Sequence, residues 1–149
     1  PICVYQVQGS GGGALMEARA LLQAAKRGGN IIFVFEMDGL RLAHMGDIGH
    51  LPDEATLKAM GHIDILLIPV GGVYTVDYKQ ALEIAYAIAP KVVIPMHYAA
   101  DKLAFELGEL APFLENAKNC AIHRMRQSEA VITRESLGSN RIIVLDCAV

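Results

Sequence analysis

The chain has 149 residues, of which 53% are hydrophobic and 19% are charged, and its formal net charge is −3. This length and composition fit one domain, 1–149, with a sizeable core, and the charge argues against a nucleic-acid-binding surface. There is no apolar run of about 18 residues, and the three cysteines are far apart without a C-x-x-C pair. We therefore expect a cytoplasmic protein with neither a membrane span nor a disulfide framework.

The apolar pattern along the chain alternates between strand and helix periods. It predicts strands at 2–7, 30–37, 40–45, 64–70, 91–96, 121–123, 130–133 and 141–145. It predicts helices at 14–26, 53–60, 78–89 and 112–118. Asp38-Gly39 predicts a tight hairpin turn, and Asp77 with Gln80 has capping-box spacing at the head of a helix. The order of elements predicts an α/β layered fold with helices packed on a sheet.

A glycine-rich segment follows the first predicted strand. Its spacing, Gly9-x-Gly11-x-x-Ala14, matches the turn of a dinucleotide-binding fold, provided that a helix begins there. Such a turn would offer backbone N–H groups to a phosphate. The acidic residue that the site needs about 20 residues later has no clean counterpart, because Glu36 and Asp38 lead into the predicted hairpin. A plain flexible loop is therefore the favoured interpretation, and cofactor binding is the alternative.

The most site-like stretch is 41–50, Arg-Leu-Ala-His-Met-Gly-Asp-Ile-Gly-His. Its first residues follow the alternating pattern of a strand, and this pattern ends at Gly46 and Gly49, on either side of Asp47. The Asp47 carboxylate is therefore predicted to project from a strand end. A second apolar strand, 91–96, is followed directly by His97. We therefore expect Asp47 and His97 to meet at the same edge of one sheet. Carboxylate and imidazole groups are both common metal ligands.

Three segments carry a family resemblance. They are Gly-Asp-Ile-Gly-His (46–50), Asp-Ile-Leu-Leu-Ile-Pro-Val-Gly-Gly (64–72) and Val-Ile-Pro-Met-His-Tyr (93–98). In order and spacing they resemble the metallo-β-lactamase superfamily, and within it the branch of ascorbate-6-phosphate lactonase and related metal-dependent hydrolases. The resemblance implies an αββα sandwich, a zinc cofactor and hydrolysis of an ester, lactone or phosphoester. It also implies that Asp47 bridges two metal ions and that His97 binds one of them.

One part of the family pattern is missing from the chain. The main ligand motif, H-x-H-x-D-H, has no counterpart, so the resemblance covers an αββα sandwich truncated at the N-terminal half. A zinc site needs roughly three or four protein ligands; Asp47 and His97 supply two, and His50 is the candidate for a third. Two interpretations therefore stand. One is a metal-dependent hydrolase, active or inactivated by loss of this motif, and the other is a non-catalytic half-fold that serves as a binding or assembly module.

Other residues near the predicted site have structural alternatives. The resemblance implies that three of them line a substrate cleft: Tyr74, Thr75 and Tyr98. Their structural alternatives are a helix-entry loop and aromatic packing at a strand end. Among the remaining histidines, His44 is interpreted as a hydrogen-bonded core residue, and His62 and His123 as surface or strand-edge residues.

Several predicted strands look apolar on both faces: 31–35, 65–68 and 92–94. A strand that is buried on one face only should alternate instead. The predicted helices can cover one side of the sheet, so the other side needs a separate cover. We expect a homo-oligomer, in its simplest form a dimer related by a two-fold axis, that acts on a small-molecule substrate if it is active.

Overall fold

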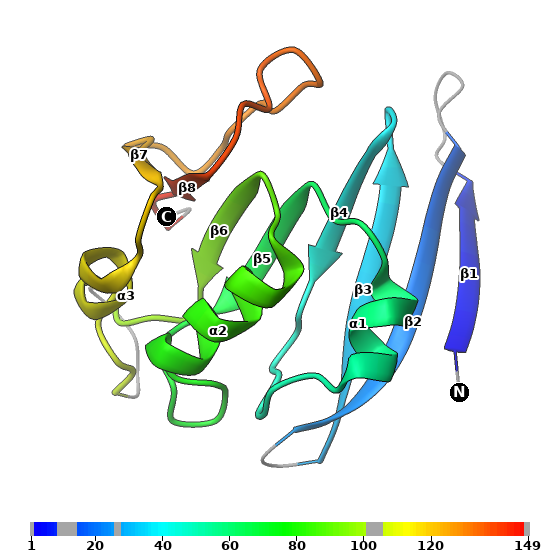
Figure 1. Ribbon diagram of the computed structural model, residues 1–149, viewed down its shortest axis with the longest axis horizontal. Coiled ribbons are helices and arrows are strands. Elements are labelled where there is room, and N and C mark those ends of the chain that lie inside the picture. The colour runs from blue at the N-terminus through cyan, green and yellow to red at the C-terminus, as the bar shows by residue number, and fades with distance from the viewer. Residues whose placement is uncertain (1, 9–14, 26–27, 101–105, 148–149) are drawn as a thin grey trace.

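The computed structural model describes residues 2–8, 15–25, 28–100 and 106–147. These residues form one mixed sheet with the strand order β1-β2-β3-β4-β5-β6-β8-β7 (Figure 1). The strands are β1 (Ile2–Gln8), β2 (Leu15–Ala25), β3 (Gly28–Met37), β4 (Leu40–His44), β5 (Ile65–Pro69), β6 (Val92–Met96), β7 (Ala121–Arg124) and β8 (Arg141–Val144). The helices are α1 (Glu54–Met60), α2 (Tyr78–Ile88) and α3 (Ala111–Asn116). Strands β1 to β4 pair in antiparallel fashion, whereas the pairs from β4 through β5, β6 and β8 to β7 are parallel.

The turn between β3 and β4 confirms the predicted hairpin. Asp38 and Gly39 both have a positive φ, 49° and 71°. A two-residue type I′ turn requires this conformation at both positions. The turn fixes a register that places Phe33 opposite His44, the last residue of β4. It therefore determines where β4 ends and where the loop that carries Asp47 begins.

Local capping interactions fix the ends of α1 and α2. Asp53 caps α1, and its side chain accepts a hydrogen bond from the backbone of the first helical turn. Asp77 and Gln80 form the predicted capping box at the start of α2. This helix ends at Ala89 in the left-handed conformation, directly before Pro90, which cannot continue a helix. None of the helices in the described ranges is long and apolar enough to cross a membrane.

The prediction of a helix over 14–26 is wrong, because this segment contains strand β2. Its register with β3 runs from Glu17 opposite Glu36 to Ala25 opposite Gly28, and its other edge pairs with β1. Helical spacing of apolar residues is a local signal, and backbone pairing with two neighbouring strands outweighs it here. The glycine-rich segment 9–14 lies outside the described residues. The dinucleotide-binding interpretation nevertheless loses its premise, since no helix follows that segment.

The prediction of a strand at 130–133 is also wrong. Ala130 and Ile132 pack as part of a loop against the sheet face that the helices leave uncovered. Val131, between them, is 88% exposed. A turn follows, in which Thr133 donates its backbone N–H to the Ser136 hydroxyl at 2.8 Å. Ala130 and Ile132 therefore face the sheet and Val131 faces solvent, as in a strand, although the segment is a loop that packs on the sheet.

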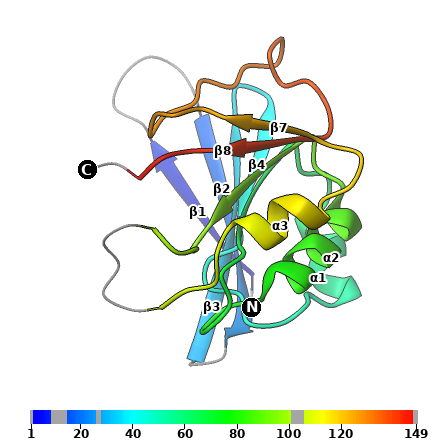
Figure 2. The same ribbon diagram turned by 90° about the vertical axis from the view of Figure 1, so that its left-hand side faces the viewer.

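The two faces of the sheet are covered unequally. Helices α1, α2 and α3 lie on one face (Figure 2), where they share the larger hydrophobic core with residues such as Ile32, Leu66 and Phe113. On the other face, a smaller cluster forms beneath loop residues 125–137. Beyond that loop, Ile31 is 41% exposed. The described residues thus form one helix layer on one sheet, which is the arrangement expected for half of an αββα sandwich.

Candidate functional site

Asp47 and His97 follow the carboxyl ends of two strands that flank β5. Asp47 comes three residues after the end of β4, and His97 comes directly after β6. Because β4, β5 and β6 run parallel, their carboxyl ends lie at the same edge of the sheet. The pairing continues beyond the strands, since Met45 donates its N–H to the Leu67 carbonyl and Val70 donates to the Met96 carbonyl, both at 3.0 Å. The expected placement of both residues at one sheet edge is therefore observed.

The loop after β5 connects the two sides of this edge. At one end of the loop, Gly71 donates its N–H to the carbonyl oxygen of His97 at 2.9 Å. At the other end, Val76 donates its N–H to the carbonyl oxygen of Ile48, the residue after Asp47, at 2.8 Å. Residues 71–76 thus tie the backbone of the Asp47 loop to that of the His97 loop.

The backbone around Asp47 is held by two side chains. The N–H of Asp47 donates to Oδ1 of Asn30 at 2.9 Å, and the N–H of Gly46 donates to Nδ1 of His44 at 3.1 Å. The Asp47 side chain itself is exposed. Sequence reasoning did not single out Asn30, and the signal for it was a polar residue at the start of an otherwise apolar strand, 30–35.

His44 is half-buried and acts as a hydrogen-bond acceptor, so the hydrogen bond expected for this histidine is present although its side chain is only half-buried. Burial lowers the pKa of His44, against the opposing influence of the nearby Asp47 carboxylate. A neutral imidazole is required here, because Nδ1 accepts the Gly46 N–H. His62 and His123 are exposed, in agreement with their interpretation as surface residues.

The imidazole of His97 has an unusual environment. Its Nε2 atom is buried and has no hydrogen-bond partner among the described residues. The residue also has a positive φ of 53°, a conformation that is uncommon outside glycine and that concentrates at functional sites. A buried imidazole nitrogen without a partner is costly unless something else coordinates it. This nitrogen therefore has the properties of a metal ligand.

We expect a Gly71→Ala substitution to disturb the position of His97. A Cβ atom at Gly71 would collide with the carbonyl oxygen of His97 and would lie 3.0 Å from Cα of Tyr98. Overpacking of this kind should lower the free energy of unfolding by at least about 1 kcal/mol, measured by urea denaturation. Gly72→Ala is the matched control, because its nearest non-neighbouring atoms are 3.8 Å away and only its φ of 66° is unfavourable. An unchanged His97 imidazole NMR signal in Gly71→Ala would contradict the expectation.

The other predicted site residues lie at or near the same edge. His50 is exposed, and its Nδ1 lies 2.7 Å from the carbonyl oxygen of Leu51. If Nδ1 donates to that oxygen, Nε2 carries the free lone pair that a metal ligand needs. Among the residues that the structure describes, no three His, Cys, Asp or Glu side chains form a group that could hold a metal ion. The ligand roles of Asp47, His97 and His50 stay predictions.

Two of the three predicted cleft residues, Thr75 and Tyr98, already have structural roles. Thr75 is fully buried, and its hydroxyl lies 3.2 Å from the carbonyl oxygens of Gly72 and Val76. Tyr98 is half-buried and donates its hydroxyl to the carbonyl oxygen of Leu145 at 3.1 Å. Burial is also the main cause that raises the pKa of the Tyr98 phenol. Tyr74 is half-buried in the loop that joins the two halves of the edge. Whether these residues also contact a substrate stays a prediction.

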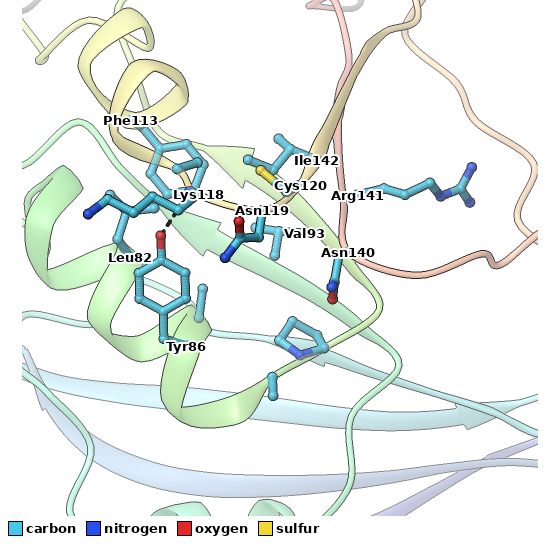
Figure 3. A pocket seen from close by; sticks show the side chains of 14 residues that line it. Leu82, Tyr86, Val93, Phe113, Lys118, Asn119, Cys120, Asn140, Arg141 and Ile142 are labelled. Carbon is cyan, nitrogen blue, oxygen red and sulfur yellow. Dashed lines mark hydrogen bonds between the residues drawn. The ribbon is translucent and has the colours of Figure 1, made fainter.

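A separate cavity of about 220 Å³ lies between α2, α3 and the parallel strands (Figure 3). At its rim, the Tyr86 hydroxyl accepts a hydrogen bond from the backbone N–H of Lys118 at 3.1 Å. Burial raises the pKa of the Cys120 thiol, which disfavours the reactive thiolate. Pro90 and Asn140, which precede β6 and β8, also line the cavity. It therefore lies at the amino ends of these strands, opposite the edge of Asp47 and His97.

Comparisons with known proteins agree with the resemblance seen in the sequence. A family model described as the beta-lactamase superfamily domain matches residues 5–97. A protein of Methanoregula boonei, named UPF0173 metal-dependent hydrolase, is 32% identical over 100 residues, which cover 66% of this chain and 45% of that protein. A protein of Thermoplasma acidophilum with the same family name is 46% identical over 66 residues, covering 44% of this chain and 29% of that protein. The chain thus spans less than half the length of these relatives.

Solved structures show the same likeness. A crystal structure from Thermotoga maritima, provisionally named a Zn-dependent hydrolase of the metallo-beta-lactamase superfamily, has a TM-score of 0.78 and 32% identity. The match covers 93% of this chain and 70% of that one. The metallo-beta-lactamase fold protein YhfI from Bacillus subtilis has a TM-score of 0.57 at 7% identity, a likeness that concerns the fold alone. The predicted superfamily and fold are therefore confirmed, whereas the lactonase branch stays a prediction.

Proposed function

Because the chain belongs to the metallo-β-lactamase superfamily, we propose that it forms part of a metal-dependent hydrolase with Asp47 and His97 among the metal ligands. The observation that carries this proposal is the Nε2 atom of His97, which is buried without a hydrogen-bond partner in the described structure. It lies at the sheet edge where Asp47 presents an exposed carboxylate. The relatives named metal-dependent hydrolases support the same assignment.

The residues present fit a metal only in part. Carboxylate oxygen and imidazole nitrogen suit zinc, which binds roughly three or four protein ligands. Asp47 and His97 supply two donors, and His50 is the candidate for a third. Since the described residues contain no group of three such side chains, we propose that a complete site takes further donors from another polypeptide segment.

The proposed reaction is hydrolysis of an ester, lactone or phosphoester. A zinc ion would supply a nucleophile from water near neutral pH and would polarise the oxygen of the scissile group. The chain's own contribution is to hold the ligands: hydrogen bonds to the backbone fix the Asp47 loop, and Gly71 fixes the His97 loop. Tyr74, Thr75 and Tyr98 are the proposed cleft residues on this edge.

Calorimetric titration with zinc, combined with elemental analysis after dialysis, tests the proposal. With only part of a ligand set, the isolated chain should bind zinc far more weakly than a structural zinc site and should lose it on dialysis. The Asp47→Ala and His97→Ala variants should abolish even this weak binding. The control is His123→Ala, because this exposed histidine lies on β7.

Two results would count against these expectations. Equal zinc binding by the wild type, Asp47→Ala and His97→Ala would remove both residues from the ligand set. Stoichiometric zinc that survives dialysis would show that the chain itself provides more ligands than we propose.

A non-catalytic half-fold that serves as a binding or assembly module is the second candidate. Two observations favour it: the described residues lack a three-ligand group, and one face of the sheet is only partly covered. Such a module would show no zinc-dependent hydrolysis of ester, lactone or phosphoester substrates, yet it would still associate through that face.

A further inference from the structure

Asn30 is a buried polar residue at the point where β4 ends and the Asp47 loop begins. The residue is 5% exposed, and its side chain makes two hydrogen bonds to the backbone. Nδ2 donates to the carbonyl oxygen of Met45, and Oδ1 accepts the N–H of Asp47, both at 2.9 Å. Because one partner is an acceptor and the other a donor, they settle the orientation of the amide.

The side-chain amide of Asn30 provides hydrogen bonds at the point where backbone pairing between β3 and β4 ends. Regular pairing between β3 and β4 ends at Phe33 opposite His44. The next residue, Met45, donates its N–H to β5 instead, at the carbonyl oxygen of Leu67. Its own carbonyl oxygen is then satisfied by the Asn30 side chain. Asn30 thus holds this stretch to β3 after regular strand pairing has stopped.

Close packing around Gly46 supports the same conclusion. Gly46 has a φ of 59°, and a Cβ atom there would collide with Oδ1 of Asn30 and would lie 2.8 Å from the carbonyl oxygen of Ile31. The loop can therefore approach Asn30 this closely only because residue 46 is glycine. The resulting contact places the Asn30 amide directly against the backbone of Asp47.

We propose that Asn30 is a positioning residue that fixes the backbone of Asp47 and thereby sets where the Asp47 carboxylate meets the metal. The inference rests on the proposed function in one respect, that Asp47 is a metal ligand. The Asp47 side chain is exposed, so packing does not hold it. Its backbone is the part that the protein fixes, and a side-chain amide on the neighbouring strand provides that restraint.

Two variants of Asn30 separate positioning from general stability. Asn30→Ala removes both hydrogen bonds, whereas Asn30→Asp keeps an oxygen that can accept the Asp47 N–H. Hydrogen exchange of the Asp47 amide, followed by NMR without metal, should become several-fold faster in Asn30→Ala and stay protected in Asn30→Asp. Zinc affinity of Asn30→Ala, measured by calorimetry, should fall about 10- to 100-fold, as is typical when a group that orients a ligand is lost.

Ile32→Ala provides the matched control for destabilisation. Ile32 is fully buried on the same strand, and its side chain belongs to the core on the helix side of the sheet. We expect this variant to be less stable and yet to keep both the relative protection of the Asp47 amide and the zinc affinity of the wild type.

The outcomes distinguish the two proposals. Unchanged exchange of the Asp47 amide in Asn30→Ala, or an equal loss of zinc affinity in Ile32→Ala, would overturn the positioning role. Faster exchange in Asn30→Ala, together with no difference in zinc binding between the wild type and Asp47→Ala, would instead overturn the ligand role of Asp47. In that case Asn30 would position the loop without serving a metal site.

Discussion

Replacement of Asp64 by alanine is expected to lower the free energy of unfolding by about 2–4 kcal/mol. Asp64 is only 6% exposed and precedes β5 directly. Its Oδ2 atom accepts the backbone N–H of Arg41 at 3.0 Å, and its own N–H donates to the Arg41 carbonyl at 2.8 Å. Alanine would leave the Arg41 N–H without its acceptor. Loss of the acceptor for the part-buried Arg41 N–H should account for most of the decrease in the free energy of unfolding.

The other carboxylate oxygen of Asp64 contacts two more segments. Oδ1 lies 3.0 Å from Nε2 of His62 and 3.5 Å from Nζ of Lys91. These side chains are 65% and 47% exposed, so solvent screens both pairs and each adds little. The Asp64 carbonyl also accepts the backbone N–H of Lys91 and of Val92. Asp64 therefore connects the beginnings of β4, β5 and β6.

The same residue should make stability depend on pH. Burial acts to raise the pKa of Asp64, but the hydrogen bond from Arg41 and the contacts with His62 and Lys91 outweigh it, so the pKa lies below its usual value. A carboxyl group whose pKa is lower in the folded state contributes stability above its unfolded-state pKa. This contribution should disappear as the pH falls below the ordinary range of an aspartate.

Urea denaturation at a series of pH values tests both statements. Asp64→Asn is the matched control, because its side-chain oxygen can still accept the Arg41 N–H while its charge is gone. We expect Asp64→Asn to lose less stability than Asp64→Ala at neutral pH and to show a weaker loss of stability in acid than the wild type. Equal stabilities of Asp64→Ala and the wild type would show that the Arg41 N–H finds another partner.

The parts of the fold that the sequence predicted correctly were those with local chemical signals. Asp38-Gly39 set the hairpin because both residues tolerate a positive φ. Asp77 and Gln80 set the start of α2 because their side chains satisfy backbone N–H groups. The placement of Asp47 and His97 at one edge followed from strand ends in a parallel sheet.

The errors arose where a nonlocal partner decides the structure. Segment 14–26 has helical spacing, but β1 and β3 pair with it on both sides. Segment 130–133 has strand-like residues, but no strand in the described structure pairs with it. Asn30 was missed for the same reason, because its partners Met45 and Asp47 are 15 and 17 residues away and only the folded register brings them together.

We expect the chain to form a homodimer through the face of the sheet opposite the helices. Two rows of side chains cross that face. One row follows the cross-strand partners Phe33, His44, Leu67 and Ile94, and the other follows Phe35, Leu42, Ile65 and Val92. Cross-strand partners share a face of the sheet. Apart from His44, every member of these rows is apolar.

This face is only partly covered within the chain. Segment 130–135 lies over part of it and leaves a hollow of about 450 Å³ whose lining includes Leu42, Leu67 and Ile94. Beyond it, Ile31 is 41% exposed, and Phe33 and Phe35 are half-buried, with their rings stacked at a centroid distance of 6.0 Å. At about 25 cal/mol per Å², several hundred Å² of such surface in water would cost on the order of 10 kcal/mol. A second copy that presents the same apolar face is the simplest cover.

Light scattering at micromolar concentration measures the association directly. We expect a mass of two chains, twice 16.1 kDa. Leu67→Glu, which would place a carboxylate in the middle of the face, should dissociate the dimer, because a buried charge without a partner is strongly unfavourable. Ile122→Glu is the matched control: Ile122 is 44% exposed, and its strand partner Ile142 belongs to the core on the helix side. A stable monomer of the wild type would show that the chain needs no second copy to cover this face, and dissociation by Ile122→Glu alone would place the interface on the opposite side of the sheet.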